Sequence, residues 1–253
     1  MAEQPTTPRD WDGATYDRIA APMARWGADV LDRLALRGDE TVLDVGCGSG
    51  RVTERLLERL PHGRVIALDG SPSMISAARE RLARFGERVT YVVADLGAPL
   101  PLERAAIDAV LSTATFHWVR DHDALFHSLA AVLRPGGRLV AQCGGAGNIA
   151  TVRAAIAAAG EPWDGPWTFA APDETRGRLE AAGFTEIETW LHDEPTALEP
   201  GEPLREYLRT VVLGAHLDRL PAGRRNAFVE AVAAGLPTPM IDYVRLNILA
   251  TRR

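Results

Sequence analysis

The stretch Val42-Leu43-Asp44-Val45-Gly46-Cys47-Gly48-Ser49-Gly50 decides the fold class of this chain. Its apolar-weighted first half predicts a short buried strand, its glycines predict a turn, and residues 51–60 continue in a helical pattern. A strand that breaks into a glycine turn and then a helix directs backbone N–H groups and the positive end of a helix dipole toward one point. Glycines there allow the main chain to approach a ligand closely. The sequence therefore predicts a ligand-binding loop at Gly46, Gly48 and Gly50.

The spacing of these glycines argues against a dinucleotide cofactor. A G-x-G-x-x-G motif would place its last small residue at position 51, which is Arg51. All 28 basic residues of the chain are arginine. The absence of lysine excludes P-loop nucleotide hydrolysis, Schiff-base chemistry and lysine-dependent short-chain dehydrogenation. A nicotinamide oxidoreductase, which would share the strand–glycine–helix start, is disfavoured on both counts.

Composition narrows the class of protein further. The chain has 253 residues, 46% of them hydrophobic, and a formal net charge of −6, which argues against nucleic acid as a partner. Residues 1–12 lack the features of a signal peptide, and no apolar run has the length of a membrane span. Cys47 and Cys143 are interpreted as reduced, buried thiols rather than as a disulfide or metal site. These features predict a cytoplasmic monomer or homodimer without membrane contact.

Strand and helix patterns alternate along the first half of the chain. Strands are expected at residues 41–45, 64–68, 89–93, 107–112 and 138–142, and helices at 51–60, 71–84 and 122–133. Such alternation with short connections predicts an α/β, doubly wound parallel sheet covered on both faces. Two further strands are expected at 184–192 and 242–251, which makes seven.

The whole chain, residues 1–253, is interpreted as one domain. Residues 11–37 are expected to form an N-terminal helical cap, built on a long amphipathic helical region at 11–36, and residues 38–145 the ligand-binding core. Residues 146–182 would form a lid and a helix that Asp173 caps and Gly183 ends. Residues 183–253 would hold the last two strands, with a helical insert at 203–236 that Pro221-Ala222-Gly223 divides in two.

Three acidic residues fall at or near the ends of three successive predicted strands. They are Asp44, Asp69 and Asp95. Ligands of open α/β sheets bind at the carboxyl ends of the strands. Asp69 follows Gly46 by 23 residues, close to the spacing at which an acidic residue accepts both hydroxyls of a ribose.

Two further motifs make the core resemble a known family. Residues 69–74 match D-x-S-x-x-M and residues 133–137 match L-x-P-G-G, and with the glycine loop they resemble the class I S-adenosylmethionine (SAM) dependent methyltransferases. Within this class the chain is similar to the trans-aconitate methyltransferase group of small-molecule methyltransferases. That closer similarity rests on Trp11, Tyr16, the Thr115-Phe116-His117-Trp118 segment and the helical insert.

The resemblance implies a Rossmann-like sheet, mostly parallel with an antiparallel last strand, that binds SAM and releases S-adenosylhomocysteine. It implies that Met74 and Leu96 flank the adenine and that Thr113 contacts the methionine part. The cofactor residues expected in full are Asp44, Gly46, Cys47, Gly48, Gly50, Asp69, Gly70, Ser71, Met74, Ala94, Asp95, Leu96 and Thr113.

A small-molecule methyl acceptor is expected in a capped pocket beside the cofactor. His117 is the candidate catalytic base, although a carboxylate acceptor would need none. The expected substrate-binding residues are Trp11, Tyr16, His117, Trp118, Trp163 and Trp167. The candidates for binding an anionic acceptor are Arg51, Arg205, Arg209 and Arg245. His122 and His127 are interpreted as helix-surface or capping residues, and no metal is expected.

The predicted reaction is in-line methyl transfer to an acceptor, with a carboxylate or hydroxyl oxygen favoured. A SAM-binding protein without catalysis, acting as a regulator or partner subunit, is the alternative. Methylation of nucleic acid or of protein is the remaining option. The negative charge disfavours nucleic acid, and the chain has no N-P-P-Y or D-P-P-Y tetrapeptide of the amino methyltransferases.

Overall fold

The computed structural model of the protein describes residues 21–253, with side chains from residue 25 onward. Trp11, Tyr16 and the first part of the predicted N-terminal helical region lie outside the described residues. The rest of that region contains helix α2, Ala21–Asp32.

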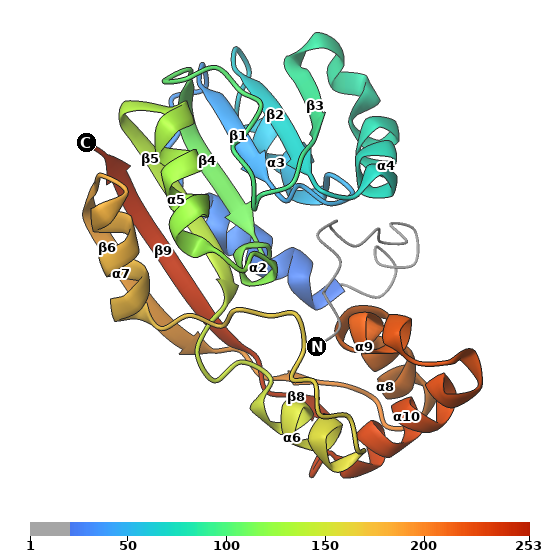
Figure 1. Ribbon diagram of the computed structural model, residues 1–253. Coiled ribbons are helices and arrows are strands. Elements are labelled where there is room, and N and C mark those ends of the chain that lie inside the picture. The colour runs from blue at the N-terminus through green and yellow to red at the C-terminus, as the bar shows by residue number, and fades with distance from the viewer. Residues whose placement is uncertain (1–20) are drawn as a thin grey trace.

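A seven-stranded sheet forms the centre of the molecule, in the order β3-β2-β1-β4-β5-β9-β6 (Figure 1). Six strands run parallel, and β9 pairs antiparallel with both of its neighbours. The doubly wound, mostly parallel sheet predicted from the sequence is confirmed. The strands are β1 Thr41–Val45, β2 Arg64–Asp69, β3 Val89–Val93, β4 Ile107–Thr113, β5 Leu133–Gly144, β6 Phe184–Asp193 and β9 Val244–Arg252.

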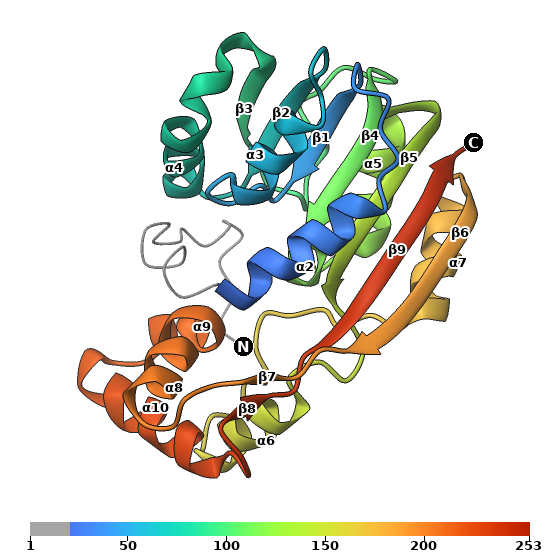
Figure 2. The same ribbon diagram turned by 180° about the vertical axis from the view of Figure 1, so that it is seen from behind.

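Helices cover both faces of the sheet because successive strand residues point to opposite sides. In β1, Val42 packs with the helices of one face and Leu43 with those of the other. Figure 2 shows the first face, covered by α2, α3 Arg51–Glu58 and α4 Pro72–Leu82. The opposite face carries α5 His122–Val132 and α7 Pro172–Ala181.

A separate group of helices lies beyond the carboxyl ends of the strands (Figure 1). It has its own hydrophobic core, to which Trp26 of α2 and Tyr243 also belong. Its members are α6 Ala150–Ala158, α8 Glu202–Tyr207, the π-helix η3 Leu208–Val212, α9 Gly214–Arg219 and α10 Ala222–Gly235. Short connecting elements are η1 Ala83–Arg88, η2 Phe116–Trp118, β7 Thr196–Ala197 and β8 Met240–Ile241.

Several predicted boundaries were wrong. Strand β5 begins at Leu133, because Leu133 pairs with Ile107 ahead of a register shift, and the Pro135-Gly136-Gly137 turn lies inside it. The helical insert has an additional break at Leu213, where a π-helical turn ends. Asp173 does not cap α7, because that helix begins earlier, with Pro172 in its first turn.

Gly46 is the glycine of the fold least able to accept a side chain. Its φ is 74°, and an added Cβ would lie 2.0 Å from Thr115 Oγ1. We expect Gly46→Ala to lower the free energy of unfolding by about 2–4 kcal/mol, from overpacking and left-handed strain together. Gly177→Ala is the control, since Gly177 lies exposed in α7 and its added Cβ would meet nothing within 4 Å. That change should raise stability by about 0.5–1 kcal/mol. Denaturant unfolding measures both, and an unaffected Gly46→Ala variant would contradict the packing described.

Candidate functional site

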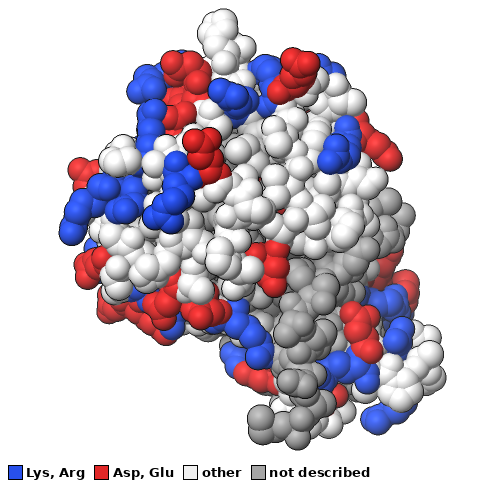
Figure 3. All heavy atoms as spheres, turned by 45° about the horizontal axis from the view of Figure 1, so that its top comes forward, with Lys and Arg blue, Asp and Glu red and all other residues white. Residues whose placement is uncertain are grey.

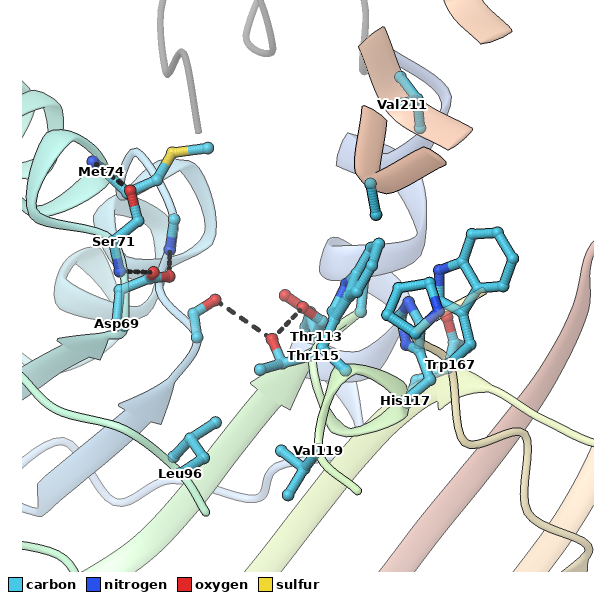
Figure 4. A pocket seen from close by; sticks show the side chains of 18 of the residues that line it. Asp69, Ser71, Met74, Leu96, Thr113, Thr115, His117, Val119, Trp167 and Val211 are labelled. Atoms are coloured by element: carbon cyan, nitrogen blue, oxygen red, sulfur yellow. Dashed lines mark hydrogen bonds between the residues drawn. The ribbon is translucent and has the colours of Figure 1, made fainter. Parts of the chain in front are cut away.

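A cavity of about 890 Å³ opens where the strand order reverses between β1 and β4. Open α/β sheets bind ligands at this position, and the volume lies within the range of small-molecule sites. Figure 4 shows its two sides, with Asp69, Ser71 and Met74 on one and His117 and Trp167 on the other. The sheet contributes the first side, and the segments after β4 and α6 contribute the second.

The three glycines of the loop after β1 have different surroundings and different structural roles. Gly46 packs against Thr115, whose hydroxyl donates to the carbonyl of Thr113. Gly50 packs against Leu82 of α4, and its φ of 84° starts helix α3. At Gly48 an added Cβ would meet nothing within 4 Å, and the residue lines the cavity. The loop therefore leaves open backbone at Gly48 for a ligand.

The carboxylate of Asp69 joins this loop to the start of the next helix. Its Oδ2 accepts from the Gly48 N–H and its Oδ1 from the Ser71 N–H, each at 2.9 Å. The Ser71 hydroxyl in turn accepts from the Met74 N–H at 3.2 Å and caps α4. Each carboxylate oxygen has a second lone pair, so Asp69 can still accept from a ligand hydroxyl.

Asp44 lies beneath the loop and does not line the cavity. It is 1% exposed, Oδ2 accepts from the Thr53 hydroxyl at 2.6 Å, and Oδ1 has no hydrogen-bond partner. Burial, with a smaller contribution from the nearby Asp69 charge, raises the pKa of Asp44 to about 7. The same causes, together with Asp44 itself, raise the pKa of the Cys47 thiol well above its ordinary value.

The far end of this side suits a flat apolar ring with polar edges. Met74 and Leu96 are buried side chains that line the cavity. Asp95 lies beside them and accepts from the Gly97 N–H at 2.8 Å. Open backbone at Gly48, a carboxylate at Asp69 and apolar flanks at Met74 and Leu96 fit the three parts of an adenosyl amino acid.

His117 occupies the other side of the cavity with a fixed protonation state. Its Nδ1 accepts from the Gly144 N–H at 3.3 Å, so the ring proton lies on Nε2. The ring lies 5.2 Å from Trp118 and 5.9 Å from Phe169, centre to centre. Burial, followed by the charge of Arg245 and by His122, lowers the pKa of His117 well below its ordinary range. His117 is therefore a neutral hydrogen-bond donor at physiological pH.

Arg245 of β9 is the buried cation of the cavity wall. It is 3% exposed, its Nε donates to Gln142 Oε1 at 3.3 Å, and its guanidinium lies 4.6 Å from the Trp26 ring centre. The Gln142 amide is oriented by Asn247, whose Oδ1 accepts from Gln142 Nε2 at 3.0 Å and from Arg33. This network of buried side chains fixes where the arginine charge lies.

Two strained residues border the same cavity. Ala114 and Ile149 both have positive φ, 61° and 50°, which non-glycine residues rarely adopt. Ile149 is β-branched, and its N–H donates to the Asp242 carbonyl at 2.9 Å. Backbone strain of this kind concentrates at binding sites, where the surrounding structure holds it in place.

Most of the predicted site residues lie together in the cavity wall. Those that line it are Gly46, Cys47, Gly48, Asp69, Gly70, Ser71, Met74, Ala94, Asp95, Leu96, Thr113, His117, Trp118, Trp163 and Trp167, with Arg51 and Arg245. The residues that do not line it are Asp44, Gly50, Arg205 and Arg209. The two last-named arginines instead pair with Glu202.

The prediction that His122 lies on a helix surface was wrong, and Gln142 was not predicted as a site residue. His122 is 2% exposed, and its Nε2 forms a 3.0 Å hydrogen bond with the Phe116 carbonyl, so it is not a surface residue. Gln142 is a polar residue within a buried strand, and that signal could have identified it. Val211, Val212 and Tyr243 also line the cavity, and their apolar patterns carried no such signal.

On the face in Figure 3, acidic and basic side chains are interspersed around a broad uncharged area. Residues 21–253 contain no group of three or more His, Cys, Asp or Glu side chains placed to hold a metal ion. No helix in that range combines the length and the apolar character that crossing a membrane requires.

Sequence comparisons identify methyltransferases as relatives. A family profile described as a methyltransferase domain matches residues 42–137. The chain is 34% identical over 263 residues to trans-aconitate 2-methyltransferase of Methylobacterium nodulans, covering 96% of this chain and 98% of the relative. It is 31% identical over 239 residues to the protein of the same name from Methylobacterium radiotolerans, covering 88% and 87%.

Solved structures with the same fold include methyltransferases. The YcgJ protein from Bacillus subtilis has a TM-score of 0.67 at 16% identity, covering 90% of this chain and 98% of that one. Phosphoethanolamine N-methyltransferase 2 of Haemonchus contortus, in complex with SAM, has a TM-score of 0.62 at 20% identity, covering 90% and 52%. At these identities the likeness shows the fold alone.

The pKa of Asp44 predicts an unusual pH dependence of stability. Since the folded protein holds this proton up to about pH 7 and the unfolded chain releases it near the ordinary pKa of 3.8, stability falls as the pH rises between these values. The loss should be on the order of 4 kcal/mol. The Asp44→Asn variant should therefore be more stable than wild type. The difference in free energy of unfolding should grow from pH 4 to pH 7 and stay constant above pH 7.

Denaturant unfolding of the ligand-free proteins at several pH values measures this difference. Thr53→Val, which removes the hydrogen bond that favours the charged carboxylate, should extend the fall of stability to higher pH. A difference between wild type and Asp44→Asn that does not vary with pH would show that Asp44 is charged when buried.

Proposed function

The chain belongs to the class I SAM-dependent methyltransferases, in the group of trans-aconitate 2-methyltransferase, and we propose that it methylates a carboxylate oxygen of a small-molecule acid. The observation that carries this proposal is the pair of donors in the cavity wall. His117 presents a neutral N–H, and Arg245 presents a buried positive charge. A carboxylate is the acceptor that suits both.

The sheet side of the cavity suits the cofactor. SAM supplies a methyl group on a positively charged sulfur, already activated for displacement. Asp69 would accept the ribose hydroxyls, and Met74 and Leu96 would pack against the adenine, with Asp95 near its polar edge. The Gly48 backbone would lie against the amino-acid part, and Asp44 beneath the loop would support it through its hydrogen bond with Thr53, without direct contact to the cofactor.

The state of His117 favours a carboxylate over a hydroxyl acceptor. A hydroxyl must lose its proton, and a base must be free to take it. The Nδ1 of His117 is occupied by the Gly144 N–H, and its Nε2 already carries a proton. A carboxylic acid is ionised near neutral pH and needs no base. The chain then has only to bind the acid, orient it toward the methyl group and exclude water.

The relatives support the same class of acceptor. Those at 34% and 31% identity are named for transfer to trans-aconitate, itself a carboxylic acid. In-line displacement needs the acceptor oxygen and the cofactor on adjoining sides of one cavity. Figure 4 shows that Asp69 and His117 lie on the two sides of one pocket.

We expect the protein to bind S-adenosylhomocysteine and not NAD(H), and Asp69→Ala to weaken this binding by at least about tenfold. The reason is that a carboxylate accepting ribose hydroxyls makes bonds of roughly 1.5–3 kcal/mol each. The variant also loses the contacts to Gly48 and Ser71, so Asp69→Asn, which keeps one acceptor oxygen, should lose less. Calorimetry measures each affinity. An Asp69→Ala variant that binds as tightly as wild type would show that Asp69 only holds the loop and does not bind the ribose.

We expect removal of either donor to affect the acceptor and not the cofactor. His117→Ala and Arg245→Met should each lower kcat/KM for the acid by about 10- to 100-fold, the effect of losing a hydrogen bond to a charged group. Their affinity for S-adenosylhomocysteine should not change. Arg209→Ala is the control, because Arg209 does not line the cavity.

The pH dependence of the rate distinguishes a donor from a base. Because burial lowers the pKa of His117 well below its ordinary value, kcat at saturating SAM should show no limb near the ordinary histidine pKa. A wild-type limb near that pH that disappears in His117→Ala would make His117 a base and favour a hydroxyl acceptor.

A further inference from the structure

We propose that Asn148 is a further acceptor-binding residue, whose side-chain amide nitrogen donates a hydrogen bond to the same carboxylate as His117. This inference rests on the carboxylate methylation proposed above and identifies another group that holds the acid. Asn148 lies between β5 and α6 and lines the cavity. Three features carry the inference. They are the fixed orientation of the amide, the donor that it presents to the cavity, and the position of that donor beside Gly144.

The orientation of the Asn148 amide is fixed by the main chain of β9. Asn148 is 3% exposed, and its Oδ1 accepts from the Val244 N–H at 2.8 Å. A backbone N–H can only donate, so the amide oxygen lies toward Val244 and the nitrogen on the other side. The backbone is held at the same point, because the Gly145 N–H donates to the Val244 carbonyl and the Asn148 N–H to the Gly145 carbonyl, each at 3.0 Å.

The Asn148 amide nitrogen is an available hydrogen-bond donor of the cavity wall. In the range 21–253 no residue accepts a hydrogen bond from it. It is not one of the polar atoms of that range that are fully buried without a partner, so it belongs to the small exposed part of Asn148. That part faces the cavity, which Asn148 lines. An unpaired N–H in a largely buried residue is costly, and an acceptor atom of a ligand in the cavity would satisfy it.

Gly144 brings this donor next to His117. A Cβ at Gly144 would lie 2.7 Å from Asn148 Nδ2 and 2.8 Å from Phe169 Cε1, so the amide nitrogen packs directly over the glycine. The φ of Gly144 is not positive, so this glycine provides space for its neighbours rather than an unusual backbone conformation. The Gly144 N–H in turn donates to His117 Nδ1 at 3.3 Å. The imidazole and the amide therefore adjoin the same residue and present donors to the same region of the cavity.

The backbone that follows Asn148 is strained and held from one side. Ile149 is β-branched and has a φ of 50°. Its N–H donates to the Asp242 carbonyl, and the Asp242 carboxylate accepts from the Thr151 N–H, both at 2.9 Å. Such strain persists where the surrounding structure imposes it, commonly at binding sites. The strained residue thus directly follows the one that presents the donor.

A carboxylate can accept from both donors and still react. Its two oxygens offer about four lone-pair positions, of which His117 and Asn148 would use two. A remaining lone pair forms the new oxygen–carbon bond while the electrons of the methyl–sulfur bond leave with S-adenosylhomocysteine, and no proton has to be removed. Two fixed donors hold the acid in one orientation, which is the main requirement of an in-line displacement.

Two substitutions of Asn148 separate its donor from the oxygen that holds Val244. Both lose the amide donor, but Asn148→Asp keeps an oxygen that can accept from the Val244 N–H, and it places a negative charge beside the acid. We expect Asn148→Ala to lower kcat/KM about 10- to 100-fold, mainly through KM, and Asn148→Asp to lower it further. A purely structural role predicts the opposite order. The affinity of both variants for S-adenosylhomocysteine should stay that of wild type.

The rates are measured on the full-length protein at pH 8.5 with saturating SAM, and methyl esters are detected by mass. This pH lies above the pKa of about 7 of the buried Asp44, so we expect the carboxyl introduced at position 148 to be charged. The acid is the best substrate of wild type among trans-aconitate, trans-cinnamate and octanoate. Asn226→Asp is the matched control, because Asn226 is exposed in α10 and does not line the cavity, and it should leave kcat/KM unchanged.

A double variant tests whether the two donors hold one carboxylate. An acid that has lost one donor is no longer held in place for the other. The loss of kcat/KM in the variant with both His117→Ala and Asn148→Ala should therefore be smaller than the product of the two single losses, by at least about threefold.

The outcomes distinguish this inference from the proposed function. An Asn148→Asp variant that is as active as wild type, or more active than Asn148→Ala, would overturn the inference and leave carboxylate methylation standing. Weakened binding of S-adenosylhomocysteine by both variants would do the same, since it would assign Asn148 a structural role. Single losses that multiply in the double variant would overturn the shared carboxylate. No ester from any of the three acids would contradict the proposed function and this inference together.

Discussion

The two hydrogen bonds that Asp69 accepts from backbone N–H groups are the contact on which the cofactor side depends. They connect the loop after β1 with the turn after β2, and so align the start of α4 with the open backbone at Gly48. The carboxylate that would bind the ribose thus also builds the loop beside it. Charge-assisted bonds to backbone amides are among the stronger hydrogen bonds in proteins, so this geometry exists before any ligand binds.

The acceptor side depends on a network of buried polar side chains on two paired strands. Arg245, Gln142 and Asn247 lie on the paired strands β5 and β9, where Gln142 faces Asn247 in register. A charge buried in this way is costly unless it is fully hydrogen-bonded. The free-energy cost of burying Arg245 is offset because the paired strands hold Gln142 and Asn247 in position to form these hydrogen bonds. The result is a rigid positive charge near a neutral imidazole donor, since Arg245 pairs with Gly144, whose N–H donates to His117.

The sequence predicted the cofactor side more completely than the acceptor side, for a physical reason. Gly48, Asp69 and Met74 lie within 27 residues of one another in local motifs, whose spacing determines their geometry. The acceptor wall joins distant segments such as His117, Trp167 and Arg245, which only the fold brings together. Arg205 and Arg245 were equivalent in the sequence, and burial alone distinguishes them. The protonated nitrogen of His117 depends on the Gly144 N–H, which no motif indicates.

The unusual environment of Cys47 has a consequence for the chemical durability of the enzyme. SAM is an alkylating agent, and a thiolate is among the groups it would most readily alkylate. Cys47 lines the same cavity, but burial and the neighbouring carboxylates of Asp44 and Asp69 hold the pKa of its thiol well above physiological pH. Because the thiolate is the nucleophilic form, the protonated Cys47 sulfur does not react with SAM bound nearby. Burial first, and the acidic residues around the loop second, thereby keep the Cys47 thiol in its less nucleophilic form.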